Sequence, residues 1–277
     1  MDLNTKLLIV AALLPAVILC VYVYKKDKVE KEPLGFLLQL FLLGALSCGP
    51  AVILEEKIIY FIDLIFGKLS KNGCNFYLGI DDFYFYNLAY YFIGVALVEE
   101  GLKWLIFKFF VFKDKNFNSL FDGLVYAIFI SLGFAALENV LYVTQYGWMN
   151  ALTRGVLSVP GHMFFSVMMG YYYSRWQILK EAREVEVTLR NEGTIVSDKP
   201  YFTYKGCAVM SLLIPVLIHG TYNFCLTADN IIFTVIFMIF IGFLYGFSFY
   251  TIKKVSASDG YNETYVNKLL SKKYLTK

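Results

Sequence analysis

Long apolar stretches, separated by short charged segments, dominate the whole chain. A bilayer core about 30 Å thick is crossed by a helix of roughly 20 apolar residues. Seven stretches approach or exceed that length, at residues 3–24, 34–54, 84–112, 120–145, 160–178, 206–228 and 230–252. The pattern therefore predicts an all-α fold, a polytopic membrane bundle of about seven transmembrane helices.

A shorter apolar piece, residues 58–66, follows the charged residues Glu55, Glu56 and Lys57. We interpret this piece as an interfacial or re-entrant extension of the second span. The two glutamates come about one full bilayer crossing after the start of that span. We therefore expect them at the outer interface, where a charge costs little.

The composition agrees with a membrane protein. Of the 277 residues, 58% are hydrophobic and only 17% are charged, whereas a soluble domain carries about 25% charged residues. The apolar stretches leave no room for a separate soluble domain, so we expect one membrane-embedded domain over residues 1–277. The net charge of +3 gives no reason to expect a nucleic-acid partner.

The basic residues predict the orientation. Nineteen of the 25 lysines and arginines fall in or beside alternate connections, and only four fall in or near the others and the N-terminus. Because cytosolic loops are enriched in lysine and arginine, the N-terminus is expected outside and the C-terminus in the cytosol. Residues 180–205 then form a solvated cytosolic loop, in which a short helix or hairpin can form, and residues 253–277 form a cytosolic tail. Cys74 and Cys225 would both face the outer side, where they could pair.

A few polar residues lie inside the predicted spans. They are Glu99, Glu100, Lys103, Glu138, Asn139, His162, His219 and Asn223. A charged side chain at the bilayer centre costs about 2.5–3.5 kcal/mol even on the lenient insertion scale, so such residues mark functional sites. One intramembrane histidine could be a hydrogen-bonded packing residue. Two histidines and three carboxylates on four spans favour a site.

The spacing of these residues indicates which of them share a helix face. Lys103 follows Glu99 by four residues and Glu100 by three, so its ammonium group can pair with either acid. His219 and Asn223 are also four residues apart and project toward one point. Small residues recur every fourth position over residues 123–139, which predicts the close approach of another helix.

Four short motifs on consecutive spans carry a resemblance. EEGLK at residues 99–103, FAALEN at 134–139, GHMFFS at 161–166 and HGTYN at 219–223 resemble motifs of the PrsW family of bacterial intramembrane proteases. The likeness covers residues 27–224, with the motifs in the expected order. That family belongs with the CAAX-protease and bacteriocin-processing superfamily.

The resemblance implies roles for these residues. In the superfamily a glutamate and a histidine activate water, while a later histidine and asparagine form the oxyanion hole. Glu99 and Glu100 match the paired acids, and His219 and Asn223 match the oxyanion pair. Four residues after Phe134, where the superfamily has a histidine, this chain has Glu138, so His162 is a candidate for the missing imidazole. Lys103, Asn139 and Phe134 are expected to support the site.

The resemblance also implies an activity. It predicts an intramembrane endopeptidase in a bacterial plasma membrane that makes the first, outer-side cut in a single-pass regulatory protein, such as an anti-sigma factor in a stress response. No cofactor is expected, and the alternative is zinc, which two histidines and three carboxylates could hold. The residues leave two other functions open: a metal-dependent lipid amidase or hydrolase, and a proton-coupled transporter.

The depth of the candidate residues predicts the side of cleavage. At 1.5 Å per residue, Glu138 lies about 27 Å from the cytosolic start of its span, and His219 and Asn223 lie about 20 and 26 Å from theirs. His162 stands at the outer start of its own span. We therefore expect a cleft that opens to the outer face.

Overall fold

The computed structural model describes residues 2–71, 82–195, 201–227 and 230–274. Within these residues five helices are long and apolar enough to cross a membrane, which confirms a polytopic helical bundle and five of the predicted spans. They are α1 (Leu3–Lys26), α2 (Leu34–Lys71), α5 (Leu120–Tyr146), α8 (Lys205–Thr227) and α9 (Ile231–Ala257).

The other two predicted spans are also helical, and the third of the seven is less regular. The third is a succession of short helices with two π-helical segments: α3 (Asp82–Leu88), η1 (Ala89–Ala96), α4 (Leu97–Ile106) and η2 (Phe107–Val111). π-Helical turns are rare and recur at functional sites. The fifth predicted span lies within α7 (Ser158–Asn191), which follows the short helix α6 (Trp148–Val156), and the chain ends with α10 (Asn262–Tyr274).

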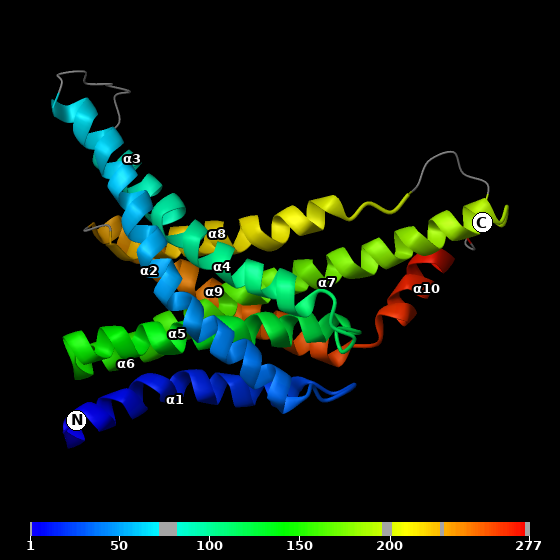
Figure 1. Cartoon of the computed structure of the whole chain (residues 1–277), viewed down its shortest axis with the longest axis horizontal. Coiled ribbons are helices and arrows are strands. Elements are labelled where there is room, and N and C mark those ends of the chain that lie inside the picture. The colour runs from blue at the N-terminus through cyan, green and yellow to red at the C-terminus, as the bar shows by residue number, and fades with distance from the viewer. Residues whose placement is uncertain (1, 72–81, 196–200, 228–229, 275–277) are drawn as a thin grey trace.

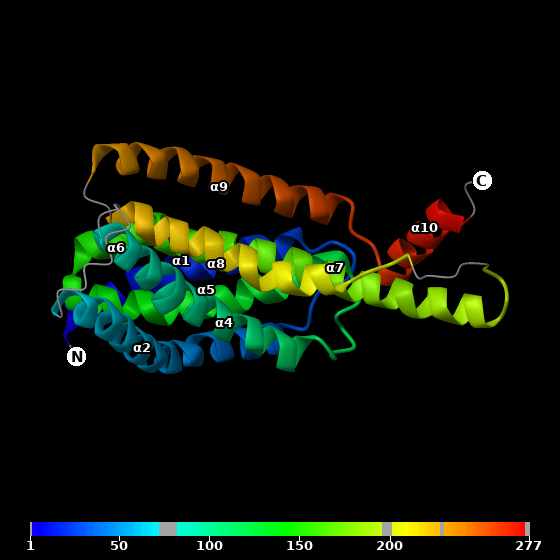
Figure 2. The same cartoon turned by 90° about the horizontal axis from the view of Figure 1, so that it is seen from above.

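Helix α5 is the central element of the bundle, as Figures 1 and 2 show. In its most apolar stretch of 18 residues, 89% of the residues are buried. It meets α2 at two glycines. A Cβ atom on Gly133 would lie 1.9 Å from the backbone oxygen of Phe41, and one on Gly44 would lie 1.9 Å from that of Ile130. The two backbones can touch here because neither glycine has a side chain.

The small-residue face of α5 packs as the sequence predicts. A Cβ atom on Gly170 of α7 would lie 2.2 Å from the backbone oxygen of Gly123, so these two helices also meet backbone to backbone. Ser131 donates to the backbone oxygen of His162 at 2.8 Å. Asn139 donates to the backbone oxygen of Ala12 in α1 at 2.8 Å.

Residues 58–66 do extend the second span, but the re-entrant alternative for this piece is wrong. Helix α2 continues without a break from Leu34 to Lys71. Residues 51–66 contain no glycine or proline, and the charged residues among them are good helix formers. Nothing in this sequence therefore interrupts the helix where it leaves the apolar span.

Residues 180–205, expected to form a solvated loop that could contain a short helix or hairpin, are more helical than expected, because α7 continues without a break to Asn191. Ile178 and Ala182 on this extension pack with Val266 of α10 in one apolar cluster. The buried Glu186 accepts a hydrogen bond from the backbone N–H of Tyr201 at 2.8 Å. As Figures 1 and 2 show, this part of α7 and α10 project together beyond the bundle.

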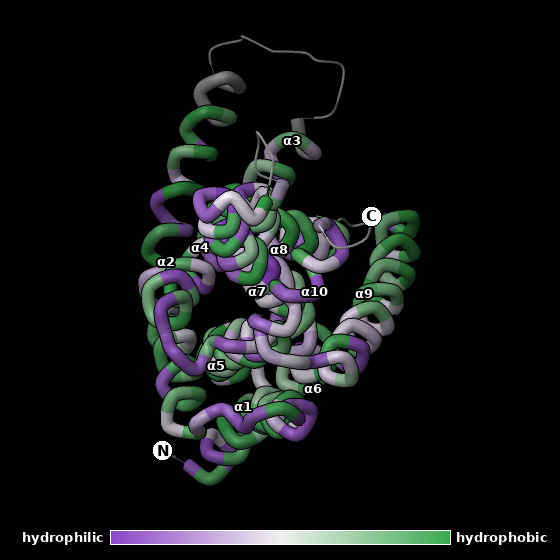
Figure 3. Tube along the Cα trace, turned by 90° about the vertical axis from the view of Figure 1, so that its right-hand side faces the viewer, coloured by the Kyte–Doolittle hydropathy of each residue, from purple (hydrophilic) through white to green (hydrophobic). Residues whose placement is uncertain are grey.

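The bundle has apolar outer faces and separated ends. Figure 3 shows strongly apolar residues along α2 and α9, where side chains such as Leu38 and Ile239 are 58% and 69% exposed. These faces suit contact with lipid. The two termini lie at opposite ends of the long axis in Figure 1, which suits a chain whose ends are on opposite sides of the membrane.

The suggested pairing of Cys74 with Cys225 involves a residue, Cys74, that lies outside the described ranges.

Buried carboxyl groups gather at the end of the bundle where α1 passes into α2. Asp27 and Glu32 from this connection are 1% and 3% exposed. Tyr126 of α5 donates a hydrogen bond to Glu32. Burial raises the pKa of Glu32 to about 8, and the nearby carboxylates of Asp122 and Asp27 add to the effect. Burial likewise raises the pKa of Asp27 to about 6.

This cluster predicts a stability that falls as the pH rises. The folded protein keeps a proton on Glu32 that the unfolded chain releases above its ordinary pKa of 4.5, so stability is lost between about pH 4.5 and 8. Glu32→Gln keeps an oxygen for Tyr126 but has no proton to lose. We expect the melting temperature of this variant in detergent to depend less on pH over that window than that of the wild type. The exposed Glu192→Gln is the control, and parallel curves for all three proteins would contradict the prediction.

Candidate active site

Helix α4 places two carboxylates and an ammonium group within one buried turn. Glu99, Glu100 and Lys103 are 5%, 0% and 1% exposed. Lys103 Nζ lies 3.3 Å from Glu99 Oε2 and 2.8 Å from Glu100 Oε1, so the lysine contacts both acids at once. The predicted pairing is therefore present with both partners.

His162 of α7 joins this group from the neighbouring helix. Its Nδ1 lies 3.1 Å from Lys103 Nζ. An ammonium group only donates hydrogen bonds, so this ring nitrogen must accept, and the proton of the neutral imidazole is then on Nε2. That nitrogen lies 3.0 Å from Glu138 Oε2 of α5, to which it donates. One tautomer of His162 satisfies both contacts.

Glu138 has a second partner that the sequence analysis did not identify. Nη2 of Arg154, on α6, lies 2.8 Å from Glu138 Oε2. The same guanidinium donates through Nε to Asn139 Oδ1 at 3.2 Å and lies 4.0 Å from the ring centre of Tyr142. The available signal was an isolated basic residue in the amphipathic segment WMNALTRGV, which we counted only as an outer-loop charge.

His219 of α8 contacts the other end of the group. Its Nδ1 lies 3.0 Å from Glu100 Oε1, and its ring stacks on Phe165 at 4.7 Å between centroids. Asn223, one turn further along α8, borders the same cavity as His219. The shared face predicted for these two residues is therefore present.

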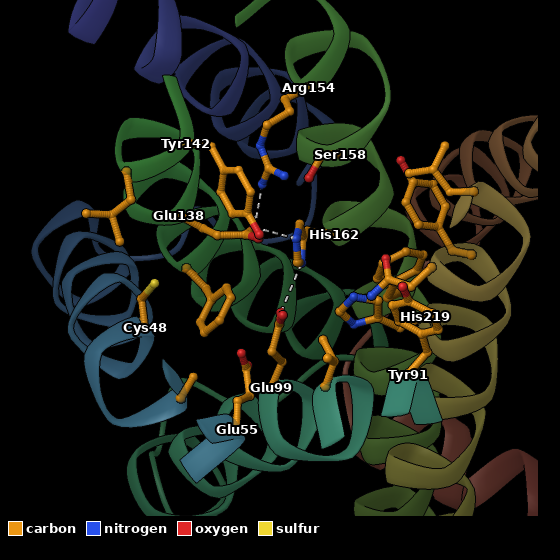
Figure 4. Close-up of a pocket in the computed structure, with 18 of the residues that line it drawn as sticks. Cys48, Glu55, Tyr91, Glu99, Glu138, Tyr142, Arg154, Ser158, His162 and His219 are labelled. Carbon is orange, nitrogen blue, oxygen red and sulfur yellow. Dashed lines mark hydrogen bonds and ion pairs between the residues drawn. The ribbon is translucent and has the colours of Figure 1, made fainter. Parts of the chain in front are cut away.

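A cavity of about 690 Å³ connects these residues, and Figure 4 shows part of its lining. Glu99, Glu138, His162, His219 and Asn223 border it. Glu100 and Lys103 do not; they lie behind the wall, fully buried.

Of the predicted supporting residues Phe134 and Asn139, only the first borders the cavity. Phe134 borders the cavity, and its ring lies 4.3 Å from Lys103 Nζ. The Asn139 amide turns away toward α1 and Arg154. Glu55, expected at the outer interface, borders the cavity because the uninterrupted α2 brings Ala51, Glu55 and Ile59 onto one face.

One group of side chains has the composition of a metal site. Glu99, Glu100 and His162 each offer a ligand atom within 4.8 Å of the others. Carboxylate oxygens and imidazole nitrogens are zinc ligands. Lys103 Nζ, however, lies within 3.3 Å of an atom of each of these three residues. In this arrangement a metal ion does not fit among the three side chains unless the ammonium group leaves.

Comparison with known proteins identifies the family. Residues 32–247 match the family described as "PrsW family intramembrane metalloprotease". This match contains the second to the sixth predicted spans, and with them every candidate residue in the group above.

Individual proteins similar to this chain carry the name of the same family. "Protease PrsW" of Geobacillus kaustophilus is 33% identical over 80% of this chain and 81% of its own length. The proteins of the same name from Bacillus subtilis and Clostridioides difficile are each 30% identical, over 84% and 80% of this chain and 90% and 80% of their own lengths. No solved structure matches the chain. The chain belongs to the PrsW family of intramembrane proteases, multi-pass enzymes of the bacterial cell membrane.

Proposed function

We propose that this protease hydrolyses its substrate with Glu99 as the general base and Glu100 as the residue that positions its neighbours. The observation that carries this assignment is the different placement of the two acids. Glu99 borders the cavity, whereas Glu100 is fully buried behind it and contacts both Lys103 and His219. Only Glu99 is therefore placed to touch water and a substrate peptide.

In the proposed reaction, Glu99 takes a proton from a water molecule beside the scissile carbonyl. The resulting hydroxide forms a bond to the carbonyl carbon, and the carbonyl π electrons move to the oxygen. When the intermediate collapses, the C–N bond breaks and Glu99 returns the proton to the leaving amine. Base catalysis of this kind is typically worth about 10²–10⁴-fold in rate.

His219 and Asn223 are the proposed donors to the developing oxyanion. Both border the cavity, on the same face of α8. His219 Nδ1 lies 3.0 Å from Glu100 Oε1. In the proposed reaction both ring nitrogens of His219 carry a proton, so Nδ1 donates to Glu100 and Nε2 donates to the oxyanion. Removing one such donor from a soluble protease costs about 2.7–4 kcal/mol in transition-state stabilisation.

The proposed reaction uses no metal ion. The place among Glu99, Glu100 and His162 that a cation would occupy already holds the Lys103 ammonium group, whose single positive charge offsets part of the negative charge of the two acids. Glu138, held by Arg154, fixes the ring of His162 from the far side. We assign Glu138, Arg154 and His162 to the positioning of the other site residues.

The proposed substrate is a single-pass regulatory membrane protein, such as an anti-sigma factor, cut at its outer juxtamembrane segment. Two observations support this. The cavity reaches Arg154 on α6 and Thr227 at the end of α8, both of which the charge distribution predicts to lie on the outer side. The motifs and the family membership agree with a protease that acts on a membrane protein.

The need for both acids can be tested by substitution. With an anti-sigma factor that the wild type cleaves, Glu99→Gln should lower kcat by about 10²–10⁴-fold with KM little changed, since glutamine keeps the shape but accepts no proton. Glu100→Gln should also abolish cleavage, because it loosens both Lys103 and His219. Glu56→Gln, an exposed acid on α2, is the matched control. Full activity in both site variants, with normal folding, would end the carboxylate mechanism.

Metal dependence has a direct test. Purified enzyme treated with a zinc chelator and desalted should keep most of its activity, and elemental analysis should find much less than one zinc per chain. The physical reason is that the Lys103 ammonium group lies among the donor atoms that a zinc ion would need. Complete inhibition that added zinc reverses would show that this lysine moves aside for a metal.

The side of cleavage can be read from the products. Mass spectrometry of the new termini should place the cut in the substrate's extracellular juxtamembrane segment or at the outer edge of its membrane span, because the cavity borders the outer ends of α6 and α8. A cut on the cytosolic side would overturn either the orientation or the site.

A further inference from the structure

Part of the cavity wall consists of exposed residues on membrane-spanning helices. Val52 of α2 and Leu141 and Tyr142 of α5 all border the cavity, yet they are 43%, 50% and 41% exposed. All three lie in membrane-spanning helices. A residue that borders a cavity and is also exposed on the outside marks a place where that cavity reaches the surface.

The packing of α2 against α5 explains the opening. The two backbones touch where Gly44 and Gly133 lack side chains. Beyond this contact, toward the outer side, α2 leans away from α5, as Figure 1 shows. From there on, Ala51 and Glu55 on one helix and Glu138 on the other border the cavity, so the space between the diverging helices belongs to it.

We call this opening between α2 and α5 the slot. The residues at its edges suit contact with an apolar segment. Val52, Leu141 and Tyr142 carry no charge, whereas the outer mouth of the cavity has Arg154 and the exposed Thr227. At 1.5 Å per residue from the starts of their helices, Val52 and Leu141 lie about 27 and 32 Å along them, which would place both near the outer edge of a hydrocarbon core about 30 Å thick. The slot therefore opens to lipid and the mouth to water.

We propose that the slot between α2 and α5 is the lateral entrance by which the transmembrane segment of the substrate reaches Glu99. This proposal rests on the proteolytic function proposed above and adds the route by which the substrate enters. An apolar helix would move sideways from the outer leaflet between Val52 and Leu141, and its outer end would reach the acids from the side. Pro50 lies next to the slot inside α2, where its missing N–H removes one helical hydrogen bond and eases bending of the outer half.

Site-specific photo-cross-linking tests the route. A benzophenone amino acid is placed at Val52 or Leu141 in a Glu99→Gln background, and the membrane-embedded anti-sigma factor is added. Ile53 and Tyr146 are the matched controls, since they are 55% and 58% exposed on the same two helices but do not border the cavity. We expect several-fold more substrate cross-linking at 52 and 141 than at the controls. Equal labelling at all four positions, or lipid adducts alone at 52 and 141, would overturn the entrance.

A kinetic comparison gives a second, independent readout. Val52→Trp should narrow the slot and lower kcat/KM for the membrane-embedded substrate at least about tenfold relative to kcat/KM for a water-soluble peptide of the same cut site. Ile53→Trp should leave this ratio unchanged. If both ratios stay at the wild-type value while Glu99→Gln is inactive, the entrance is wrong and the proteolytic assignment stands. Glu99→Gln with full activity would instead remove the proposed function itself.

Discussion

The contact of one lysine with three partners is the interaction on which the site depends. Two carboxylates on adjacent residues of a membrane helix would repel each other in a medium of low dielectric constant. Lys103 lies 3.3 and 2.8 Å from them and 3.1 Å from His162. Its charge offsets theirs, and its donors select the His162 tautomer that binds Glu138. A buried ion group of this kind adds little net stability, so we attribute its presence to chemistry.

The rest of the bundle holds this group in place. The partners of Lys103 come from α4 and α7, and Glu138 comes from α5, so the distances depend on how closely these helices approach. Glycine contacts bring α5 against both α2 and α7, while Asn139 and Arg154 link the end of α5 to α1 and α6. The contacts of His162 with Lys103 and Glu138, and of His219 with Glu100, each join two helices, so they form only where those helices pack closely.

Much of this arrangement could be predicted from the sequence because its signals are local. Lys103 stands at helical spacing from both acids, and lipid makes any polar residue in a span conspicuous. The contact of His162 with both Lys103 and Glu138 could not be predicted, since it joins residues of three helices. Arg154 was missed because a basic residue near an interface is ordinary. The extensions of α2 and α7 were misjudged because their charged sequences are also compatible with loops, and α7 is ordered by packing against α10.

The central place of α5 also bears on how the protein is made. Among the described helices, α7 is long but is not apolar enough to count as a candidate span, although it carries His162. Helix α5 meets that criterion by a wide margin and presents the glycine and serine that α7 packs against. Insertion into the bilayer is therefore expected to be ordered: the apolar α5 enters first, and its exposed small-residue face recruits the more polar α7. Biogenesis of the enzyme and assembly of its proposed active site would then be the same event.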